Sequence, residues 1–174
     1  GKKQITKTAN KEIAAKWMND SKHIAFLSNE SGSMQLGTMK DDGTARTRLT
    51  DREGDISDFS FSPDERKVLL VADVKYGKRT ADIHPDLPQA SGIIVNDLMY
   101  KHWDEWVQTV PHPFIADIEG GKLTNERDIL KDEPYESPMK PFGGIEQLAW
   151  SPDGKTIAYT CRRKAGTAFA SSTN

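Results

Sequence analysis

Apolar and polar positions along this chain repeat as one short unit, in which two apolar segments flank a tight polar turn. The clearest copy covers residues 145–161, with Ser-Pro-Asp-Gly at 151–154 as its turn. Pro152 fixes φ at a value suited to the second turn position, Asp153 can bond its own backbone, and Gly154 tolerates a positive φ. A tight turn between two β-prone apolar segments predicts a β-hairpin.

The same unit occurs at two earlier places. Each copy has an aromatic residue at the end of its first strand and an aspartate in the turn that follows. The aromatic residues are Trp17, Phe61 and Trp150, and the aspartates are Asp20, Asp64 and Asp153. The first interval matches the period of about 40–45 residues in a four-stranded propeller blade. Because the aspartates recur at one place in each unit, we expect them to stabilise turns rather than to catalyse a reaction.

The interval between the second and third copies is much longer than the first. Either two blades or one blade with a large insertion would explain it. No further aromatic-Ser-Pro-Asp copy lies between residues 64 and 150, which favours the insertion. Insertions of this length in a compact domain are usually functional or mobile.

The pattern therefore predicts an all-β chain, a partial β-propeller of four-stranded antiparallel blades with a long insertion in the second blade. We expect residues 1–174 to be a fragment of one propeller domain. Residues 1–10 would end a preceding blade, 11–55 form one blade, 56–135 form a second with an insertion at about 74–112, and 136–174 form the first half of a further blade. Because such a chain exposes strand edges, we expect copies to self-associate through open blade edges.

The individual strands follow from the same pattern. In the first blade, strands are expected at 13–17, 23–28, 34–39 and 45–49. In the second blade, they are expected at 56–61, 67–73 and 114–118, with a fourth strand after the turn at 119–122. In the third blade, they are expected at 145–150 and 157–161. The segment 68–72 is apolar at every position. This fits a strand that neighbouring blades cover on both faces.

Composition and charge exclude some classes of function. The 24 Lys and Arg residues nearly balance the 26 Asp and Glu residues and form no basic stripe, so we expect no nucleic-acid partner. No apolar segment reaches the length of about 18–20 residues that a membrane span needs. The single cysteine, Cys161, excludes an internal disulfide, and its alternation with Ile157 and Tyr159 predicts a buried strand residue rather than a reactive thiol.

The insertion has the most distinctive composition. Residues 98–106 contain Trp103 and Trp106, two of the four tryptophans, and would form either a rigid hairpin or a short helix. The histidines form no i, i+4 pair on a clear helix and no cluster with cysteine, so we expect no metal site and no cofactor. The acidic turn at 41–43 lacks the ligand spacing of a calcium loop.

Several of these segments resemble a known family. The repeated aromatic-Ser-Pro-Asp turn is similar to the WD40-like blades of TolB-type propellers and of prolyl-oligopeptidase-family propellers. Further segments resemble the dipeptidyl peptidase 5 and acylaminoacyl-peptidase-like branch of that serine peptidase family. These segments are Leu-Met-Tyr-Lys-His-Trp-Asp at 98–104, His-Pro-Phe-Ile-Ala-Asp at 112–117, Pro-Phe-Gly-Gly-Ile-Glu at 141–146 and Ser-Thr-Asn at 172–174.

The resemblance implies that the propeller caps a C-terminal α/β-hydrolase domain, which holds the Ser, Asp and His triad and acts on short peptides. A nucleophile elbow would read G-x-S-x-G, and no glycine of this chain has a serine two positions later. We therefore assign no catalytic residue and expect this chain alone to be inactive. The resemblance also implies a periplasmic or secreted bacterial protein, with a cytoplasmic location as the alternative.

Four residues of the insertion are candidates for contact with a peptide substrate: Tyr100, His102, Asp104 and Glu105. A carboxylate among them could neutralise the α-ammonium group of the substrate. The alternative is that the aromatic side chains of the insertion pack on the propeller or on the hydrolase domain. A TolB-like, non-catalytic protein-binding propeller is the second functional hypothesis.

Overall fold

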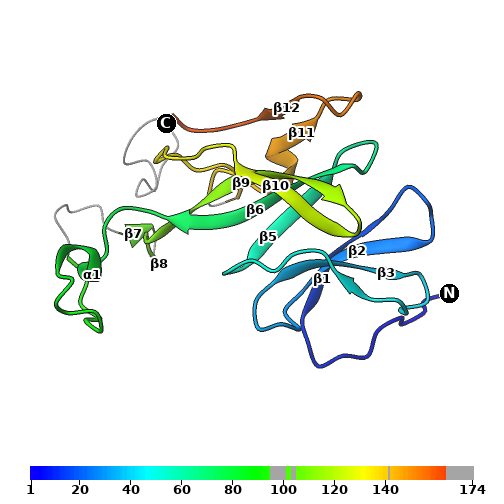
Figure 1. Cartoon of the computed structure of the whole chain (residues 1–174), viewed down its shortest axis with the longest axis horizontal. Coiled ribbons are helices and arrows are strands. Elements are labelled where there is room, and N and C mark those ends of the chain that lie inside the picture. The colour runs from blue at the N-terminus through cyan, green and yellow to red at the C-terminus, as the bar shows by residue number, and fades with distance from the viewer. Residues whose placement is uncertain (95–100, 103–104, 141, 164–174) are drawn as a thin grey trace.

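Short antiparallel strands are the main regular secondary structure in the computed structural model, which describes residues 1–94, 101–102, 105–140 and 142–163 (Figure 1). The first sheet consists of β1 (Glu12–Trp17), β2 (His23–Ser28), β3 (Gln35–Lys40) and β4 (Thr47–Arg48), in that spatial order. Each neighbouring pair is antiparallel. Four consecutive antiparallel strands joined by short turns form a propeller blade.

The second sheet contains the insertion. Its strands are β5 (Ile56–Phe61), β6 (Lys67–Lys75), β9 (Thr109–Glu119) and β10 (Lys122–Asp128), and their spatial order is β5-β6-β9-β10. Strands β6 and β9 are hydrogen-bonded neighbours although residues 76–108 separate them in the sequence. The predicted fold class is therefore confirmed: an all-β chain with four-stranded antiparallel blades and a long insertion in the second.

The segment that leaves the second sheet is shorter than the predicted 74–112. The ladder between β6 and β9 continues through Val74↔Val110 to Lys75↔Thr109. Pro111 and Pro113 lie within β9 although proline has no N–H to donate. They are tolerated because β10 pairs with β9 only as far as Phe114, so residues 109–113 have one strand partner instead of two.

The third unit is a two-stranded hairpin of β11 (Leu148–Trp150) and β12 (Ile157–Tyr159). The predicted first strand, 145–150, is wrong in its first half, because η1 (Ile145–Gln147) is a 3₁₀ turn. The side chain of Gln147 accepts a hydrogen bond from the backbone N–H of Met139 (2.8 Å) and so fixes this turn against the preceding connection. The second strand ends before Cys161, which lies outside β12 and is half-buried.

Two other segments differ from the expectation. Residues 1–10, predicted to end a preceding blade, contain no strand, and Ile5 packs against the cluster of Ile24, Phe26 and Met39. A short helix, α1 (Thr80–Ile83), lies in the insertion where none was predicted. No helix in the described parts of the chain has the length and apolar character needed to span a membrane.

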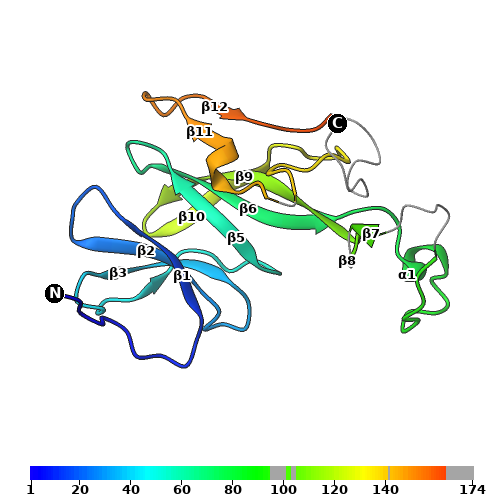
Figure 2. The ribbon, with the colours of Figure 1, turned by 180° about the vertical axis from the view of Figure 1, so that it is seen from behind.

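The core forms because the apolar side chains of β6 alternate between two neighbours. Val68 and Leu70 pack with Ala25 and Leu27 of the first sheet. Leu69 and Val71 form a second cluster, whose members from the third unit are Leu148, Trp150 and Ile157. The segment 68–72 is therefore covered on both faces, as predicted, and the three units stack in chain order (Figure 2).

The three repeated turns share one hydrogen-bond pattern. In each turn the aspartate Oδ1 accepts a hydrogen bond from the backbone N–H two residues later: Asp20 from Lys22 (2.8 Å), Asp64 from Arg66 (3.1 Å) and Asp153 from Lys155 (3.1 Å). In the last two turns a serine hydroxyl also donates to the aspartate, Ser62 at 2.7 Å and Ser151 at 2.6 Å. These contacts give the aspartates the structural role that their repetition predicted.

The turn aspartates predict a loss of stability in acid. The hydrogen bond from His23 lowers the pKa of Asp20 to about 2, and the hydroxyls of Ser62 and Ser151 lower the pKa of Asp64 and Asp153. A carboxylate whose pKa is lower in the folded state stabilises the fold above its ordinary pKa, and this stabilisation disappears as the pH falls through the folded value. We expect the unfolding temperature to fall between about pH 4 and pH 2. The double variant D64N/D153N should show a smaller fall, and an equal fall would contradict this role.

The same turns predict the effect of a side chain at Gly154. Gly154 has φ 68°, and Ser21 and Glu65 adopt φ 55° at the equivalent positions. A Cβ at Gly154 would meet Pro63 at 3.5 Å, an ordinary contact, so the cost of Gly154→Ala is conformational. We expect a loss of about 1 kcal/mol in the free energy of unfolding, measured by denaturant titration. Gly92→Ala is the control, since a Cβ there meets nothing within 4 Å.

Candidate functional site

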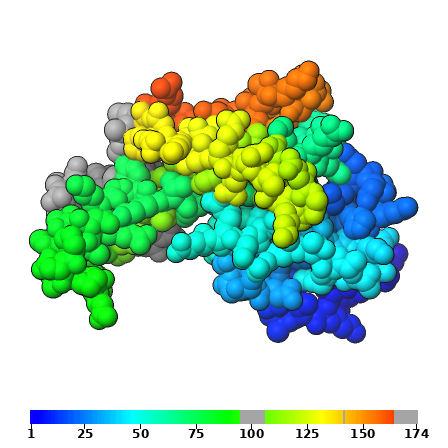
Figure 3. All heavy atoms as spheres, viewed as in Figure 1, coloured from blue at the N-terminus to red at the C-terminus, as the bar shows by residue number. Residues whose placement is uncertain are grey.

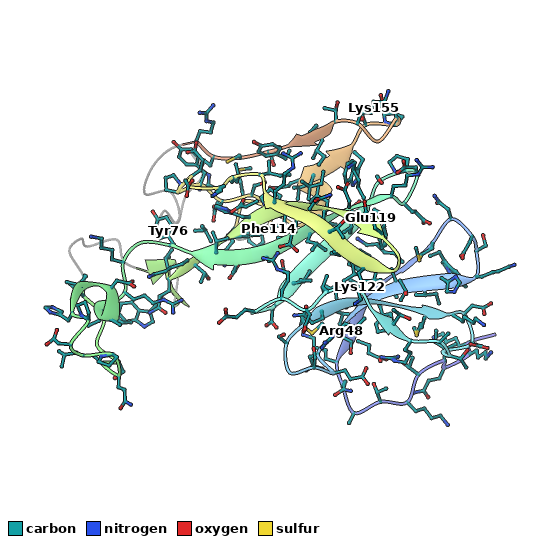
Figure 4. The ribbon with its side chains drawn as sticks, viewed as in Figure 1. Arg48, Tyr76, Phe114, Glu119, Lys122 and Lys155 are labelled. Carbon is teal, nitrogen blue, oxygen red and sulfur yellow. The ribbon has the colours of Figure 1, made fainter. Side chains whose placement is uncertain are left out.

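The two long connections of the second sheet leave it at the same end. Residues 76–108, which we call the arm, run from the end of β6 to the start of β9, and residues 129–144 begin after β10. Figure 4 shows Tyr76 where the arm begins, and Lys155 in the turn of the third hairpin at the opposite end. Long connections carry binding residues more often than repeated structural turns do. The arm end of the sheet is therefore the candidate functional end.

The arm stands away from the stacked sheets (Figure 3). An ion pair between Lys75 and Asp82 links its helix α1 to the end of β6. Asp82 also accepts a hydrogen bond from the backbone N–H of Arg79 (2.6 Å). Residues 77–94 include no buried residue. The arm therefore contributes little to the core, and its side chains are available for contact with a ligand or with another part of a larger protein.

The sequence left open whether residues 98–106 form a hairpin or a helix. In the described residues they form a hairpin, because β7 (Lys101–His102) pairs antiparallel with β8 (Glu105–Trp106). His102 and Glu105 are register partners in this ladder. Two of the four candidate substrate contacts thus lie opposite each other in a hairpin close to the start of β9 (Figure 1). The other two, Tyr100 and Asp104, lie outside the described residues.

A hollow of about 720 Å³ lies at the base of the arm, and we call it the arm-base hollow. It is bounded by the end of β6, by β9 and by the start of the connection 129–144. Its lining residues are Val74, Lys75, Tyr76, Gly77, Val110, His112, Asp128, Lys131, Asp132, Glu133 and Pro134. The hollow thus combines apolar walls with acidic, basic and aromatic groups, as ligand sites do.

The most buried polar group of this hollow is His112, which is 2% exposed. Its Nδ1 lies 2.8 Å from Oδ2 of Asp128, and Oδ1 of Asp128 accepts a hydrogen bond from the backbone N–H of Leu130 (2.8 Å). Because a carboxylate only accepts, Nδ1 of His112 is the donor in this pair. The Nε2 atom is buried and has no hydrogen-bond partner among the described residues. The pair fixes the start of the connection 129–144 against β9.

The pairing of His112 with Asp128 was not predicted from the sequence. The sequence pattern assigns no individual role to His112 and does not single out Asp128. The two residues are far apart in the chain, and they meet because β9 and β10 pair with Phe114 opposite Asp128. The available signal was that His112 is the single polar residue within the segment 110–116. In a strand of period two, His112 shares a face with Val110 and Phe114.

A second hollow, of about 580 Å³, lies between the outer strands of the two sheets. Its arginines already have partners: Arg48 pairs with Asp51 (3.1 Å) and Arg52 pairs with Glu126. The guanidinium of Arg52 also lies 4.1 Å from the ring centre of Phe114. Burial lowers the pKa of Arg52. Because the contacts of Arg52 with Glu126 and Phe114 join one sheet to the other, we assign this hollow a structural role.

Other candidate chemistry finds little support in the described residues. No three side chains of His, Cys, Asp or Glu in those residues lie together as a metal site. Asp42, in the acidic turn, accepts hydrogen bonds from the backbone N–H (2.9 Å) and the hydroxyl (2.6 Å) of Thr44. Burial raises the pKa of the Cys161 thiol, which disfavours the reactive thiolate.

Two comparisons with known proteins give partial matches. No family model matches the chain. A segment of 76 residues, 44% of the chain, is 32% identical to the Tol-Pal system protein TolB of Francisella tularensis, of which it covers 18%. Among solved structures, an acylaminoacyl peptidase of Pyrococcus horikoshii aligns with 67% of this chain and 17% of its own, at 16% identity and a TM-score of 0.45.

Two relatives cover the whole chain. This chain is 59% identical over 174 residues to dipeptidyl-peptidase 5 of Porphyromonas gingivalis. It is 40% identical over 174 residues to dipeptidyl-peptidase 5 of Porphyromonas endodontalis. The chain spans about a quarter of the length of these curated relatives, 25% in each case. The chain is thus homologous to dipeptidyl-peptidase 5 over its entire length, which confirms the resemblance drawn from its motifs.

The pair of His112 and Asp128 predicts a specific loss of stability. Asp128→Ala should lower the free energy of unfolding by about 1–3 kcal/mol, because it leaves the buried Nδ1–H of His112 without an acceptor. Chemical denaturation monitored by circular dichroism would measure this loss. Asp86→Ala, in an exposed loop of the arm, is the matched control and should change stability little. An equal effect of the two substitutions would show that the pair does not support the fold.

Proposed function

We propose that this chain is the non-catalytic propeller portion of a serine exopeptidase that removes dipeptides from short peptides. The observation that carries the proposal is the 59% identity to dipeptidyl-peptidase 5 over all 174 residues, which make up only 25% of that relative. The chain itself contains no G-x-S-x-G sequence. It therefore lacks the nucleophile elbow that would expose a catalytic serine Oγ beside an oxyanion hole. The catalytic groups would therefore belong to a hydrolase domain in another part of the polypeptide.

In this proposal the arm end of the second sheet faces the peptide substrate and limits its size. The arm-base hollow supports this, because its volume of about 720 Å³ lies within the range of about 300–1,000 Å³ typical of small-ligand sites. The opposite end of the sheet carries the repeated turns, whose polar groups are used in internal hydrogen bonds. Within the part of the chain that the structure describes, only the arm end combines a hollow with two long connections.

The first test of the proposal is an activity measurement. This chain and the full-length peptidase that contains it would be compared on a fluorogenic dipeptide substrate. We expect activity only in the full-length protein, and we expect a serine-directed inhibitor to abolish it. Activity of the isolated chain would refute the assignment of a non-catalytic role. Inactivity of both proteins would favour the TolB-like binding propeller, to which a 76-residue segment is 32% identical.

The hairpin of β7 and β8 carries the proposed contact with the substrate's amino terminus. His102 and Glu105 are register partners, and Asp104 directly precedes Glu105 in the sequence. A carboxylate here would form a charge-assisted hydrogen bond with the α-ammonium, and Tyr100 and His102 would border the same position.

Replacing both carboxylates tests this contact. In the full-length peptidase, the double variant D104N/E105Q should raise KM for peptides with a free amino terminus by about 10-fold or more, because a hydrogen bond to a charged group is worth about 1.5–3 kcal/mol. The KM for N-blocked peptides should not change, and D86N, elsewhere in the arm, is the matched control. An equal response of free and blocked peptides would exclude these residues from binding the amino terminus.

The location of the protein and its self-association stay proposals as well. Export to the periplasm or secretion would be tested by fractionation of cells that express the full-length gene, with the cytoplasm as the alternative result.

Self-association through open strand edges would be tested by sedimentation of this chain at several concentrations. The open edges have unpaired backbone groups, which favour such pairing.

A further inference from the structure

The ladder of β6 and β9 extends beyond both of its neighbouring strands at the arm end. On one side, β5 pairs with β6 only as far as Ile56↔Ala72. On the other side, β10 pairs with β9 only as far as Phe114. Residues 73–75 and 109–113 therefore form a two-stranded ribbon, and each edge of this ribbon lacks a strand partner.

The edge along β9 is closed at residues 111–113. Pro111 and Pro113 have no N–H to donate. The carbonyl of Pro111 accepts a hydrogen bond from the backbone N–H of Ser137 (2.9 Å). The carbonyl of Pro113 accepts one from the backbone N–H of Ile129 (2.9 Å). Proline and a covering segment are common protections of a sheet edge, so a further strand cannot add on this side.

The edge along β6 is open. Successive residues of an antiparallel strand direct their backbone groups to alternate sides. The backbone N–H of Tyr76, directly after β6, donates to the carbonyl of Gln108 on the β9 side (2.9 Å), so Asp73 and Lys75 direct theirs to the β5 side. Both residues are exposed and lie beyond the end of β5. Within the residues that the structure describes, these N–H and C=O groups have no hydrogen-bond partner.

The charged side chains along this edge are already engaged. Oδ2 of Asp73 accepts a hydrogen bond from the hydroxyl of Thr109 (2.7 Å), and Lys75 forms the ion pair with Asp82. Neither contact uses the backbone groups that face the β5 side. The edge therefore offers main-chain donors and acceptors at the spacing of a β-strand.

We propose that an extended peptide substrate binds as an added strand along residues 73–75 of β6, a site that we call the β6 edge. The proposal rests on the proposed function, which supplies the peptide as the occupant. Main-chain pairing holds a peptide independently of most of its side chains. It therefore suits substrates that are selected by length rather than by sequence. Val74 and Lys75 also line the arm-base hollow, so the bound peptide lies beside it.

The length of the β6 edge favours a short peptide over a second copy of the chain. Ile56 of β5 limits the edge at one end. The arm limits it at the other end, where the ion pair of Lys75 and Asp82 ties helix α1 to β6. At about 3.4 Å per residue, the opening matches a peptide of about three residues. A strand of about 5–6 residues, the common length in a sheet, needs a longer edge.

Amide hydrogen exchange tests the proposal on the unmodified full-length protein. Pentaalanine is the probe, supplied in saturating excess during a brief labelling pulse so that hydrolysis does not deplete it. We expect exchange at the amides of Asp73 and Lys75 to slow at least about 10-fold, because hydrogen bonds to an added strand protect them. Val74 is the internal control, since its N–H already faces Val110 in the ladder. Unchanged exchange at Asp73 and Lys75 would overturn the proposal.

The outcomes separate this inference from the proposed function. An active full-length enzyme in which pentaalanine protects neither amide would refute the β6 edge and leave the peptidase assignment intact. Protection by pentaalanine in an inactive full-length protein would do the reverse. Protection without peptide that grows with protein concentration would place a second copy at the edge, and the proposal would be wrong.

Methylation of the peptide gives a readout on the substrate side. Pentaalanine peptides that carry one N-methyl group each would compete with the fluorogenic dipeptide substrate. An added strand directs every second N–H to β6, so methylation at alternate amides should raise the inhibition constant by about 2- to 10-fold. Methylation at the amides between them should have little effect. Equal effects at all amides would contradict strand addition.

A substitution at Lys75 tests the protein side. Lys75→Pro removes one N–H of the β6 edge but no hydrogen bond of the ladder with β9, because this N–H points away from β9. We expect it to raise KM for pentaalanine by about 2- to 10-fold. Lys75→Gln is the matched control, since it removes the ion pair with Asp82 and keeps the N–H, and it should leave KM nearly unchanged. An equal response of the two variants would contradict binding through the backbone.

Discussion

The burial of both faces of β6 is the constraint on which the rest of this structure depends. Val68, Leu69, Leu70 and Val71 are at most 2% exposed, and they alternate between the first sheet and the third hairpin. Full burial of such a side chain is worth about 1.5–3 kcal/mol. Neither face is covered without a neighbour, so the units stabilise one another by stacking, as repeats do in other repeat proteins. Trp150 extends the same contact to the innermost strand of the second unit through its hydrogen bond to Ser60.

This dependence explains why a long insertion is tolerated in the second unit. The ladder of β6 and β9 ends at the pair Lys75↔Thr109, where the arm begins. The residues of the arm can therefore vary without loss of core packing. The arm and the connection 129–144 both leave from this end, while the repeated turns at the other end form interlocking hydrogen bonds. The chain therefore separates its structural end from the end available for recognition.

The arm end of the second sheet is held by buried polar contacts as well as by apolar packing. His112 and Asp128 join the start of the connection 129–144 to β9 at the wall of the arm-base hollow. Such a pair is directional, and it defines the geometry of the hollow more closely than apolar contacts would. In the proposed peptidase, this chain would contribute the shape and charge of an entrance and leave bond cleavage to the hydrolase domain.

The sequence by itself determined the turns, the repeat and the all-β class, because local properties dictate them: proline and glycine set backbone angles, aspartate bonds its own turn, and apolar positions alternate with period two. It also located the insertion between two strands of one blade. Only the tertiary structure decided that Pro111 and Pro113 belong to β9, that His112 meets Asp128, and that Trp150 is covered while Trp17 is exposed. These features arise from contacts between strands far apart in the chain, and the periodicity of one segment does not specify which other segment will lie beside it.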